Sequence, residues 1–343
     1  MIDQERLMDA YEKDGFYSLQ LEVGDRCEQG CIYCYMNAVT KEKNSLTDEV
    51  IREVLKDSKR LGITAIEWLG GEPLLRKGVF EHMELAKDMG LRNNIWTGGL
   101  PLADNEIRRR CRELADPGLI SVHVSTLDRD LYEKMHPHRS ADDMENILRG
   151  VESLIEEGYP PSRMLNSVTY TGLQTPEDMI STIHHFEERY GISTSLNVYH
   201  TYLRPGSDPG ELARFIPKEE DVAKIYSRLQ KQYGSGPLPM NCVDKFYCSA
   251  TLAVLCDGSV TPCATIREKD APDVHNGDGL FEIVQKRGDH LNLRYMKDED
   301  HLPRMCRDCS MNRTCFGCRS RSFSEGLSIY GPDPRCFRAR NTR

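Results

Sequence analysis

The sequence predicts an α/β protein built on a parallel sheet and followed by a smaller cysteine-rich region. Three observations support this fold class. Strand-like and helix-like segments alternate through the first two-thirds of the 343 residues, the alternation stops near residue 200, and nine of the thirteen cysteines lie beyond residue 239. Such alternation produces parallel strands joined by right-handed crossovers. The pattern alone is compatible with a doubly wound sheet and with a partial (β/α) barrel.

Six apolar segments have the length and composition of strands: 16–23, 63–69, 91–97, 119–125, 164–169 and 193–198. Helical spacing of apolar residues predicts the helices between them: 47–61, 79–89, 104–114, 143–157 and 175–190. Ser45 or Thr47 could cap the first of these helices. In either parallel architecture, the loops at the carboxyl ends of the strands are where an active site is expected.

The alternation divides the chain into four parts. Residues 1–15 are an N-terminal extension and 16–215 form the α/β domain. A further helix at 218–233 and a Gly/Pro-rich stretch lie within a linker at 216–239. Residues 240–343 form an irregular, cysteine-rich domain.

Composition indicates a cytoplasmic protein. Hydrophobic content is 39% and charged content 29%, as in ordinary globular proteins. No apolar run approaches the roughly 18 residues of a membrane span, and the charged N-terminus has no apolar signal-peptide core. Disulfides are rare in the cytoplasm, so clustered cysteines are interpreted first as metal ligands.

The net charge of −9 is unevenly distributed. Residues 304–343 hold nine arginines and three acidic residues, a balance of 9 − 3 = +6, which leaves −9 − 6 = −15 for the rest. A basic segment can indicate nucleic-acid binding. Here the arginines alternate with cysteines, so we expect them to offset the negative charge of thiolate-bound clusters, and we expect no nucleic-acid partner.

Cys27, Cys31 and Cys34 lie in the loop that follows the first predicted strand. Three thiolates can hold three irons of a 4Fe–4S cluster and leave the fourth iron open. S-adenosylmethionine (SAM) can bind there through its amine and carboxylate. An electron from the cluster would then break the C5′–S bond, giving a 5′-deoxyadenosyl radical that abstracts hydrogen. The alternative is a zinc loop, although zinc usually takes four ligands and prefers paired C-x2-C arms.

The spacing of these cysteines resembles the C-x3-C-x2-C motif of the radical SAM superfamily. This resemblance implies a partial (β/α)6 TIM-like barrel followed by a small irregular iron–sulfur domain. Tyr33 matches the aromatic residue before the third cysteine and is expected near the adenine. A ferredoxin or flavodoxin is implied as the low-potential electron donor.

Features at the ends of the next strands extend the resemblance. Residues 70–73 are similar to the family's GGEP motif, whose backbone binds the SAM amine; a plain strand–helix turn is the alternative. Residues 125–128 are similar to its Ser-x-Asp region, which faces the ribose. Thr97 lies where relatives have a polar residue near SAM, and Arg149 lies where they have an arginine for the SAM carboxylate. Arg149 is on a predicted helix and could equally be solvated. The expected SAM contacts are Tyr33, Gly70, Gly71, Glu72, Pro73, Thr97, Ser125, Asp128 and Arg149.

The remaining cysteines resemble the SPASM extension of radical SAM enzymes. Cys248-x9-Gly258-x4-Cys263 matches its first half, whereas Cys315-x2-Cys318 is one residue shorter than the common x3 spacing, a form that some tetrapyrrole-modifying relatives share. Eight thiols are enough for two fully ligated 4Fe–4S clusters. Alternatively, the cysteines of 306–318 could form one zinc site, which would leave the other four without a role.

The resemblance implies how the eight cysteines divide. The first auxiliary cluster would take Cys242, Cys248, Cys263 and Cys318. The second would take Cys306, Cys309, Cys315 and Cys336. Two cysteines are left over: Cys111 is expected to be a buried apolar filler, and Cys256 is either similar or a substitute ligand.

Full thiolate ligation leaves no iron open for substrate, so the auxiliary clusters are expected to carry electrons in an oxidative reaction. The family resemblance is to anaerobic sulfatase-maturating and peptide-modifying enzymes. Our first hypothesis is therefore oxidation or cross-linking of a peptide or protein side chain. The alternatives are small-molecule chemistry, such as tetrapyrrole decarboxylation or sugar alcohol oxidation, and a zinc-dependent binding protein.

Two departures bear on the substrate. Sulfatase-maturating relatives carry an Asp base where this chain has Ala264, which argues against formylglycine formation. Only about fifteen residues precede the first strand, so we expect no leader-binding domain there. The candidates for substrate contact are Tyr199, His200, Tyr202 and Arg204, with His136 and His138 as weaker ones. A histidine could move protons near neutral pH, although all six could be ordinary loop residues.

Overall fold

The computed structural model describes residues 2–200, 208–233, 244–326 and 328–336. Its centre is one eight-stranded sheet with the order β6-β5-β4-β3-β2-β1-β7-β8. The strands are β1 (Ser18–Glu22), β2 (Ala65–Leu69), β3 (Arg92–Trp96), β4 (Leu119–Val122), β5 (Met164–Tyr170), β6 (Ser193–Val198), β7 (Thr251–Val254) and β8 (Val260–Thr261). All neighbouring strands are parallel except β7 and β8. The α/β class with a partial TIM-like barrel is confirmed.

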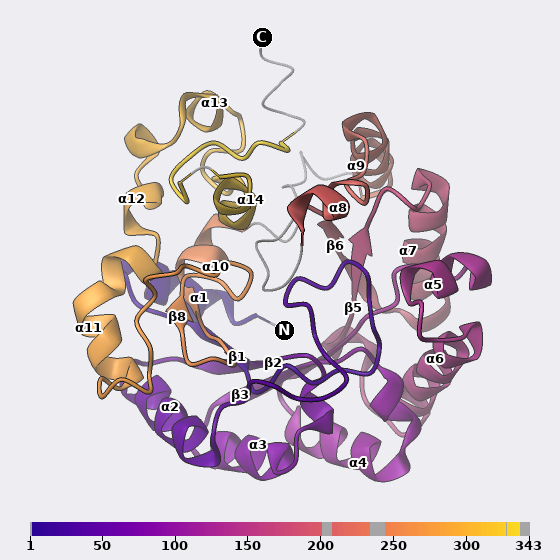
Figure 1. Cartoon of the computed structure of the whole chain (residues 1–343), viewed down its shortest axis with the longest axis horizontal. Helices are drawn as coiled ribbons and strands as arrows, with labels where there is room; N and C mark the ends of the chain where they lie inside the picture. Colours follow the sequence, from indigo (N-terminus) through magenta and orange to yellow (C-terminus); the bar gives the residue numbers. More distant parts are fainter. Residues whose placement is uncertain (1, 201–207, 234–243, 327, 337–343) are drawn as a thin grey trace.

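The longer helices form an arc outside the curved sheet, and the C-terminal segment lies across from them (Figure 1). The helices of the first 200 residues are α1 (Gln4–Glu12), α2 (Asp48–Arg60), α3 (Val79–Asp88), α4 (Asn105–Leu114), α5 (Arg129–Met135), α6 (Ala141–Glu156) and α7 (Pro176–Tyr190). Those that follow are α8 (Pro209–Ala213), α9 (Glu219–Tyr233), α10 (Lys245–Ser249), α11 (Leu280–Leu291), α12 (Arg294–Lys297), α13 (Arg304–Arg307) and α14 (Arg319–Ser324). No helix in the described ranges is long and apolar enough to cross a membrane.

The six strands expected from the sequence are all present, and local chemistry explains the helix starts. Thr47 caps α2 by accepting a hydrogen bond from the Val50 N–H, and Asp104 and Thr175 cap α4 and α7 in the same way. Helix α1 lies in the part expected to be an extension, where Asp3 caps it. Its sequence is short and mostly polar, so the spacing of its apolar residues did not predict a helix.

Strands β7 and β8 come from the part of the chain expected to be irregular. β7 pairs in parallel with β1, with Ser18 opposite Thr251, and so continues the barrel sheet beyond its first strand. The four residues of β7, a threonine followed by three apolar residues, are too short a run to identify a strand by periodicity. The consequence is that the cysteine-rich segment shares a sheet with the α/β domain.

The two faces of the sheet differ in chemistry. Residues such as Leu19, Leu21 and Ile66 point toward the helices and are fully buried in the main core. The residues that alternate with them face the inside of the barrel. There Glu67 accepts hydrogen bonds from Ser18 Oγ, Asn94 Nδ2, Trp96 Nε1 and Tyr247 Oη, a network that connects β1, β2, β3 and α10. The inner face of the barrel is therefore polar near its floor.

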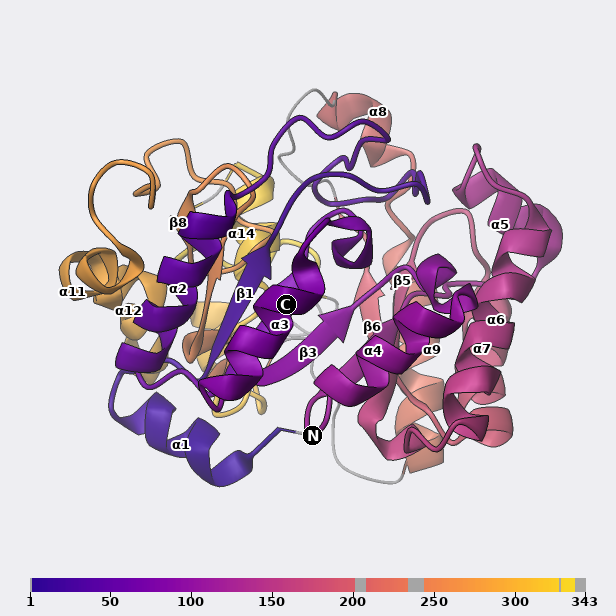
Figure 2. The same ribbon diagram turned by 90° about the horizontal axis from the view of Figure 1, so that it is seen from below.

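The strands β1 and β3 point toward the same edge, where the loop after β1 lies (Figure 2). Farther along the chain, the C-terminal segment connects both sides of the sheet. Ser320 Oγ donates to the Thr265 carbonyl beyond β8, while Cys336 packs against the cluster formed by β5, β6, α7 and α9. The cysteine-rich segment therefore spans from the β8 side to the β6 side.

Candidate functional site

The cysteine loop after β1 is held by its own backbone. Asp25 carboxylate oxygens accept hydrogen bonds from the Lys43 and Asn44 N–H groups, and the Cys27 N–H donates to the Val39 carbonyl at 2.8 Å. These bonds close a loop of about twenty residues and fix the start of the segment that carries Cys27, Cys31 and Cys34. All three cysteines are partly exposed, as ligands that meet a cofactor at a strand end should be.

The thiols of this loop carry the features of a cluster site. The Gln29 N–H lies 3.4 Å from Cys27 Sγ and the Ala38 N–H lies 3.5 Å from Cys34 Sγ; N–H groups directed at sulfur tune iron–sulfur clusters. Burial, then Glu72 and the Cys34 thiol, raises the pKa of Cys27 to about 12. Because thiolates are unfavourable there without a cation, an iron cluster would be needed to deprotonate them.

Gly70 and Gly71 join the end of β2 to this loop. The Gly71 N–H donates to the Gly24 carbonyl at 2.9 Å, and the Glu72 N–H donates to the Arg26 carbonyl at 2.7 Å. A Cβ on Gly70, whose φ is +145°, would lie 2.5 Å from the Gly24 carbonyl oxygen. The close approach that these glycines permit is therefore to the chain itself. The sequence predicted an approach to the SAM amine, with a plain strand–helix turn as the alternative.

Glu72 links the end of β2 to the end of β3. Its Oε2 accepts from Thr97 Oγ1 at 2.8 Å and from the Gly98 N–H at 2.7 Å, while Oε1 accepts from the Leu74 N–H. Burial raises the pKa of Glu72 to about 7, and the three hydrogen bonds oppose this rise. Thr97 and Pro73, both expected near SAM, are buried beside it, and Pro73 begins a short 3-10 helix. Strand ends β2 and β3 are thus connected behind the cysteine loop.

Tyr33 lies between two histidines inside the barrel. Its hydroxyl is 2.8 Å from His123 Nε2 and 3.0 Å from His136 Nε2. His136 Nδ1 faces the Tyr132 carbonyl at 2.9 Å, so its Nε2 is the acceptor in the neutral ring and Tyr33 donates to it. Burial lowers the pKa of both histidines to about 4, which keeps them neutral near pH 7. His123 was missed from the sequence, where it is a lone histidine at the end of a strand.

Replacing Tyr33 by phenylalanine is expected to lower the free energy of unfolding by about 1–3 kcal/mol, because two buried imidazole nitrogens lose a partner. Tyr295→Phe is the matched control, since Tyr295 is 52% exposed and its change should stay within about 0.5 kcal/mol. Melting temperatures measured without oxygen test this prediction. Equal shifts in the two variants would show that the hydroxyl contributes nothing.

The other expected SAM contacts lie in different environments. Ser125 is buried, and its Oγ accepts from the Thr169 N–H at 2.9 Å near His123. Asp128 is exposed and caps α5 by accepting from the Leu131 N–H. Arg149 is not brought to the site: it lies on the exposed face of α6, where its guanidinium bonds Asn146. The reason is helical phase, because α6 buries Met144, Ile147 and Val151 instead.

The candidates for substrate contact divide similarly. Tyr199 is buried and packs in one cluster with Tyr33, next to Cys31. His200 is also buried, at 1% exposure. Tyr202 and Arg204 lie outside the described residues. His136 contacts Tyr33, as above, whereas His138 is exposed beside Gly30.

The C-terminal cysteines fall into two neighbourhoods. Burial raises the pKa of Cys263, and Cys318 is the thiol that adds to this rise. Burial likewise raises the pKa of Cys306 to about 12, with contributions from the Cys336 and Cys315 thiols. Cys315, whose pKa is raised to about 11, also has Cys309 and Cys336 as its thiol neighbours. Cys248 packs in one apolar cluster with Cys263 and Cys318, and this cluster also contains Cys306 and Cys315. Cys242 lies outside the described residues.

The donor geometry differs from that of a single-ion site. Among the described residues, no three His, Cys, Asp or Glu side chains are placed so that they could share one metal ion. In a 4Fe–4S cluster each thiolate binds a different iron, so its ligands need not converge on one point. Gly317 has φ +75° and its N–H lies 3.4 Å from Cys315 Sγ, which gives the short Cys315–Cys318 turn the same N–H to sulfur contact as the first loop. The residues present therefore fit iron–sulfur clusters.

The leftover cysteines are not in these neighbourhoods. Cys111 is fully buried in the main core on α4, as expected for an apolar filler. The Cys256 N–H donates to Glu22 Oε2 at 3.3 Å. Glu22, at the end of β1, also accepts from Tyr35 Oη and from Arg267 Nη2, so it joins the first cysteine loop to the loop after Cys263.

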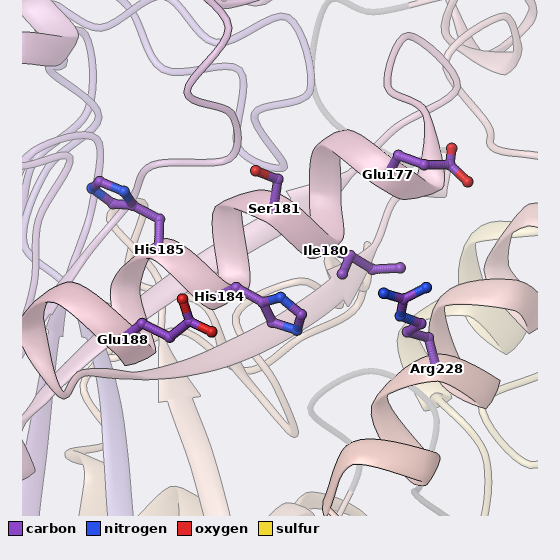
Figure 3. Close-up of a pocket in the computed structure, with 7 residues that line it drawn as sticks. All are labelled: Glu177, Ile180, Ser181, His184, His185, Glu188 and Arg228. Carbon is purple, nitrogen blue, oxygen red and sulfur yellow. The ribbon is translucent and has the colours of Figure 1, made fainter.

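A separate hollow of about 500 Å³ lies on the outside, between α7 and α9. Its lining residues, shown in Figure 3, are Glu177, Ile180, Ser181, His184, His185, Glu188 and Arg228. All of them belong to these two helices, and none is a cysteine or lies at a strand end. The hollow is therefore not part of the candidate active site.

The barrel, the cysteine loop and the connected strand ends define an enzyme that uses SAM at an iron–sulfur cluster. Comparison with protein families agrees: residues 21–186 match the model of the radical SAM superfamily. These residues, just under half of the chain, form a radical SAM domain, and the protein is a radical SAM enzyme. That class was the one indicated by Cys27, Cys31 and Cys34.

Two curated relatives are similar over most of the chain. A probable GTP 3′,8-cyclase of Methanopyrus kandleri is 26% identical over 295 residues, which cover 81% of this chain and 89% of that protein. The probable GTP 3′,8-cyclase of Methanococcus aeolicus is 28% identical over 308 residues, covering 82% of this chain and 97% of that protein.

Solved structures share the fold at low identity. SuiB of Streptococcus suis, bound to SAM, matches with a TM-score of 0.68 and 15% identity, over 97% of this chain and 80% of its own. The enzyme anSMEcpe, bound to SAM and the Cp18Cys peptide, matches with a TM-score of 0.65 and 16% identity, over 92% of this chain and 93% of its own. Both confirm that the fold extends from the barrel through most of the cysteine-rich segment.

Proposed function

We propose that this enzyme carries three 4Fe–4S clusters and oxidises a peptide or protein side chain. Cys27, Cys31 and Cys34 would hold the cluster that binds SAM. The first auxiliary cluster would be held by Cys242, Cys248, Cys263 and Cys318, and the second by Cys306, Cys309, Cys315 and Cys336. The observation that supports this division most directly is that Cys263 neighbours Cys318, whereas Cys306, Cys309, Cys315 and Cys336 neighbour one another.

Bound at the first cluster, SAM supplies a 5′-deoxyadenosyl radical that abstracts hydrogen from the substrate. The chain's own residues would position it. The backbone of Gly70, Gly71 and Glu72 runs beside the cysteine loop, where it would meet the SAM amine. Tyr33 would face the adenine with its hydroxyl fixed by His123 and His136. Ser125 and Thr97 are buried polar residues that follow β4 and β3.

Two auxiliary clusters with complete thiolate ligation support an oxidative outcome. Neither would have an iron open to substrate, so both are suited to accepting the surplus electron after hydrogen abstraction. A low-potential ferredoxin or flavodoxin would reduce the first cluster. Ala264 is buried, and its N–H donates to Gln20 Oε1 at 2.9 Å, so this position offers no carboxylate as a base.

A peptide substrate is supported by the neighbours in fold. SuiB has been seen bound to its precursor peptide SuiA, and anSMEcpe to the Cp18Cys peptide. The polar inner face of the barrel is compatible with peptide binding, because Ser167 and Asn197 place a hydroxyl and an amide on partly exposed positions of β5 and β6.

The second candidate is radical chemistry on a small molecule. It is supported by the two relatives that are named GTP 3′,8-cyclases and that align with about four-fifths of the chain. The same polar inner face would suit a nucleotide or another hydroxyl-rich molecule.

Deuterium transfer separates the two candidates. Purified enzyme, reduced with dithionite in the absence of oxygen, is incubated with SAM and either a fully deuterated peptide digest or a fully deuterated nucleotide pool that contains GTP. Hydrogen abstraction would carry substrate deuterium into 5′-deoxyadenosine, which mass spectrometry detects. Deuterium from the peptides supports the proposal, whereas deuterium only from the nucleotides contradicts it. The enzyme should also contain about twelve irons per chain.

A further inference from the structure

Arg321 is a completely buried arginine in the cysteine-rich segment. It lies on α14, three residues after Cys318, and its side chain has 0% exposure. Its Nη2 donates to Asp333 Oδ2 at 2.6 Å, and the Asp333 side chain is equally buried. Its Nε and Nη1 atoms are also buried, yet they have no hydrogen-bond partner among the residues that the structure describes.

Such donors are rare in native proteins, because burying a charged N–H without an acceptor is strongly unfavourable. Arg319, two residues before Arg321 on α14, is an example of a buried arginine with a structural role. Arg319 is 3% exposed, and all three of its nitrogens donate to backbone carbonyls, those of Phe316, Gly317, Ile329 and Gly331. Two buried arginines on α14 therefore differ: each nitrogen of Arg319 has an acceptor, whereas Nε and Nη1 of Arg321 have none among the described residues.

The surroundings of Arg321 indicate which acceptor is required. Asp333, its partner, also accepts a hydrogen bond from the Cys318 N–H at 2.8 Å, so the guanidinium lies beside that cysteine. Burial lowers the pKa of Arg321, but Asp333 and then Cys318 raise it by more, and no other thiol is a main contributor. An acceptor beside Cys318 that is buried, anionic and able to take two N–H groups matches the sulfurs of an iron–sulfur cluster.

We propose that Arg321 donates Nε–H and Nη1–H to the sulfurs of the auxiliary cluster that Cys248, Cys263 and Cys318 hold, and that it thereby raises the reduction potential of this cluster. The inference rests on the proposed auxiliary clusters. A fixed positive charge and two N–H donors stabilise the reduced form, which carries one more negative charge. The first auxiliary cluster would then be the better electron acceptor of the two.

The variants must separate a redox role from a purely structural one. Removing Arg321 alone would leave Asp333 as a buried, unpaired charge, which often prevents folding. The double variant R321M/D333N removes both charges together and keeps an acceptor for the Cys318 N–H. Arg321→Lys keeps the positive charge but replaces the planar fork of guanidinium N–H donors by the single nitrogen of an ammonium group, which cannot occupy the positions of Nε, Nη1 and Nη2 together. The control is R108M/E157Q, which removes a partly buried pair of 3.0 Å between α4 and the end of α6, far in sequence from every cysteine proposed to bind a cluster.

The experiment is a redox titration followed by electron paramagnetic resonance on iron-loaded enzyme, with iron content measured in parallel. We expect R321M/D333N to keep all its iron and to shift one cluster to a more negative midpoint potential. Arg321→Lys should shift the same cluster by less, and the control should match the unaltered enzyme. If the double variant does not retain iron, the redox titration of Arg321→Lys alone tests whether Arg321 sets the potential of the cluster.

Three unchanged potentials in an iron-replete Arg321 variant would overturn the inference and leave Arg321 with a structural role only. Failure of the proposed function gives a different result. In that case the unaltered enzyme would hold about four irons, those of the SAM cluster, and no auxiliary signal would appear before any residue is changed.

Discussion

Replacing Cys31 by alanine is expected to abolish the formation of 5′-deoxyadenosine from SAM. Cys31 is the central cysteine of the C-x3-C-x2-C loop and is proposed to bind the first cluster. Burial raises its pKa, and the neighbouring thiols of Cys34 and Cys27 add to this rise. Losing a residue that hydrogen-bonds to a metal ligand typically lowers activity or metal affinity by roughly 10–100-fold, so losing the ligand itself should have a larger effect. Iron content should fall from about twelve to about eight per chain.

Cys111→Ala is the matched control for this prediction. Cys111 is fully buried in the core on α4, far along the chain from each cysteine cluster, so its loss should leave iron content and SAM cleavage unchanged. Iron analysis and chromatography of 5′-deoxyadenosine measure both outcomes. If Cys31→Ala still cleaved SAM at the rate of Cys111→Ala, the loop after β1 would not hold the catalytic cluster.

The sequence predicted the class of enzyme because its strongest signals are local. Cys27, Cys31 and Cys34 lie within eight residues, and residues 70–73 follow a recognisable strand. Six strands and their helices were found because apolar periodicity reports burial directly. Strand β7 was missed because its four residues acquire their role only by pairing with β1, more than 200 residues earlier.

The roles of individual side chains were less accessible. Tyr33, His123 and His136 meet only through the barrel, since the two histidines are 90 and 103 residues from the tyrosine. Arg149 was expected at SAM, but helical phase directs it outward. The basic charge of 304–343 was visible in the sequence, yet only the hydrogen bonds of the structure distinguish Arg321 from Arg319. Nε and Nη1 of Arg321 have no acceptor among the described residues, whereas each nitrogen of Arg319 has one.

Replacing Gly71 by alanine tests whether the connection between β2 and the cysteine loop positions the first cluster. A Cβ at Gly71 would lie 2.8 Å from the Asp25 carbonyl oxygen and closer still to that of Arg26. Both carbonyls belong to backbone that is fixed by hydrogen bonds, so the loop must shift as a unit. Overpacking of this kind usually costs about 1–3 kcal/mol, and a backbone obstacle places Gly71→Ala at the upper end.

The matched control is Gly288→Ala in α11, where a Cβ would meet nothing within 4 Å. The same chemical change there should raise the free energy of unfolding by up to about 1 kcal/mol, because alanine favours the helix. Gly71→Ala should also slow SAM cleavage by roughly 100-fold, since a displacement of about 1 Å at a reacting group has that effect. Melting temperature and 5′-deoxyadenosine formation measure the two consequences. A Gly71→Ala enzyme that melted and reacted like the Gly288→Ala enzyme would show that the loop is positioned by its own hydrogen bonds, without the support of β2.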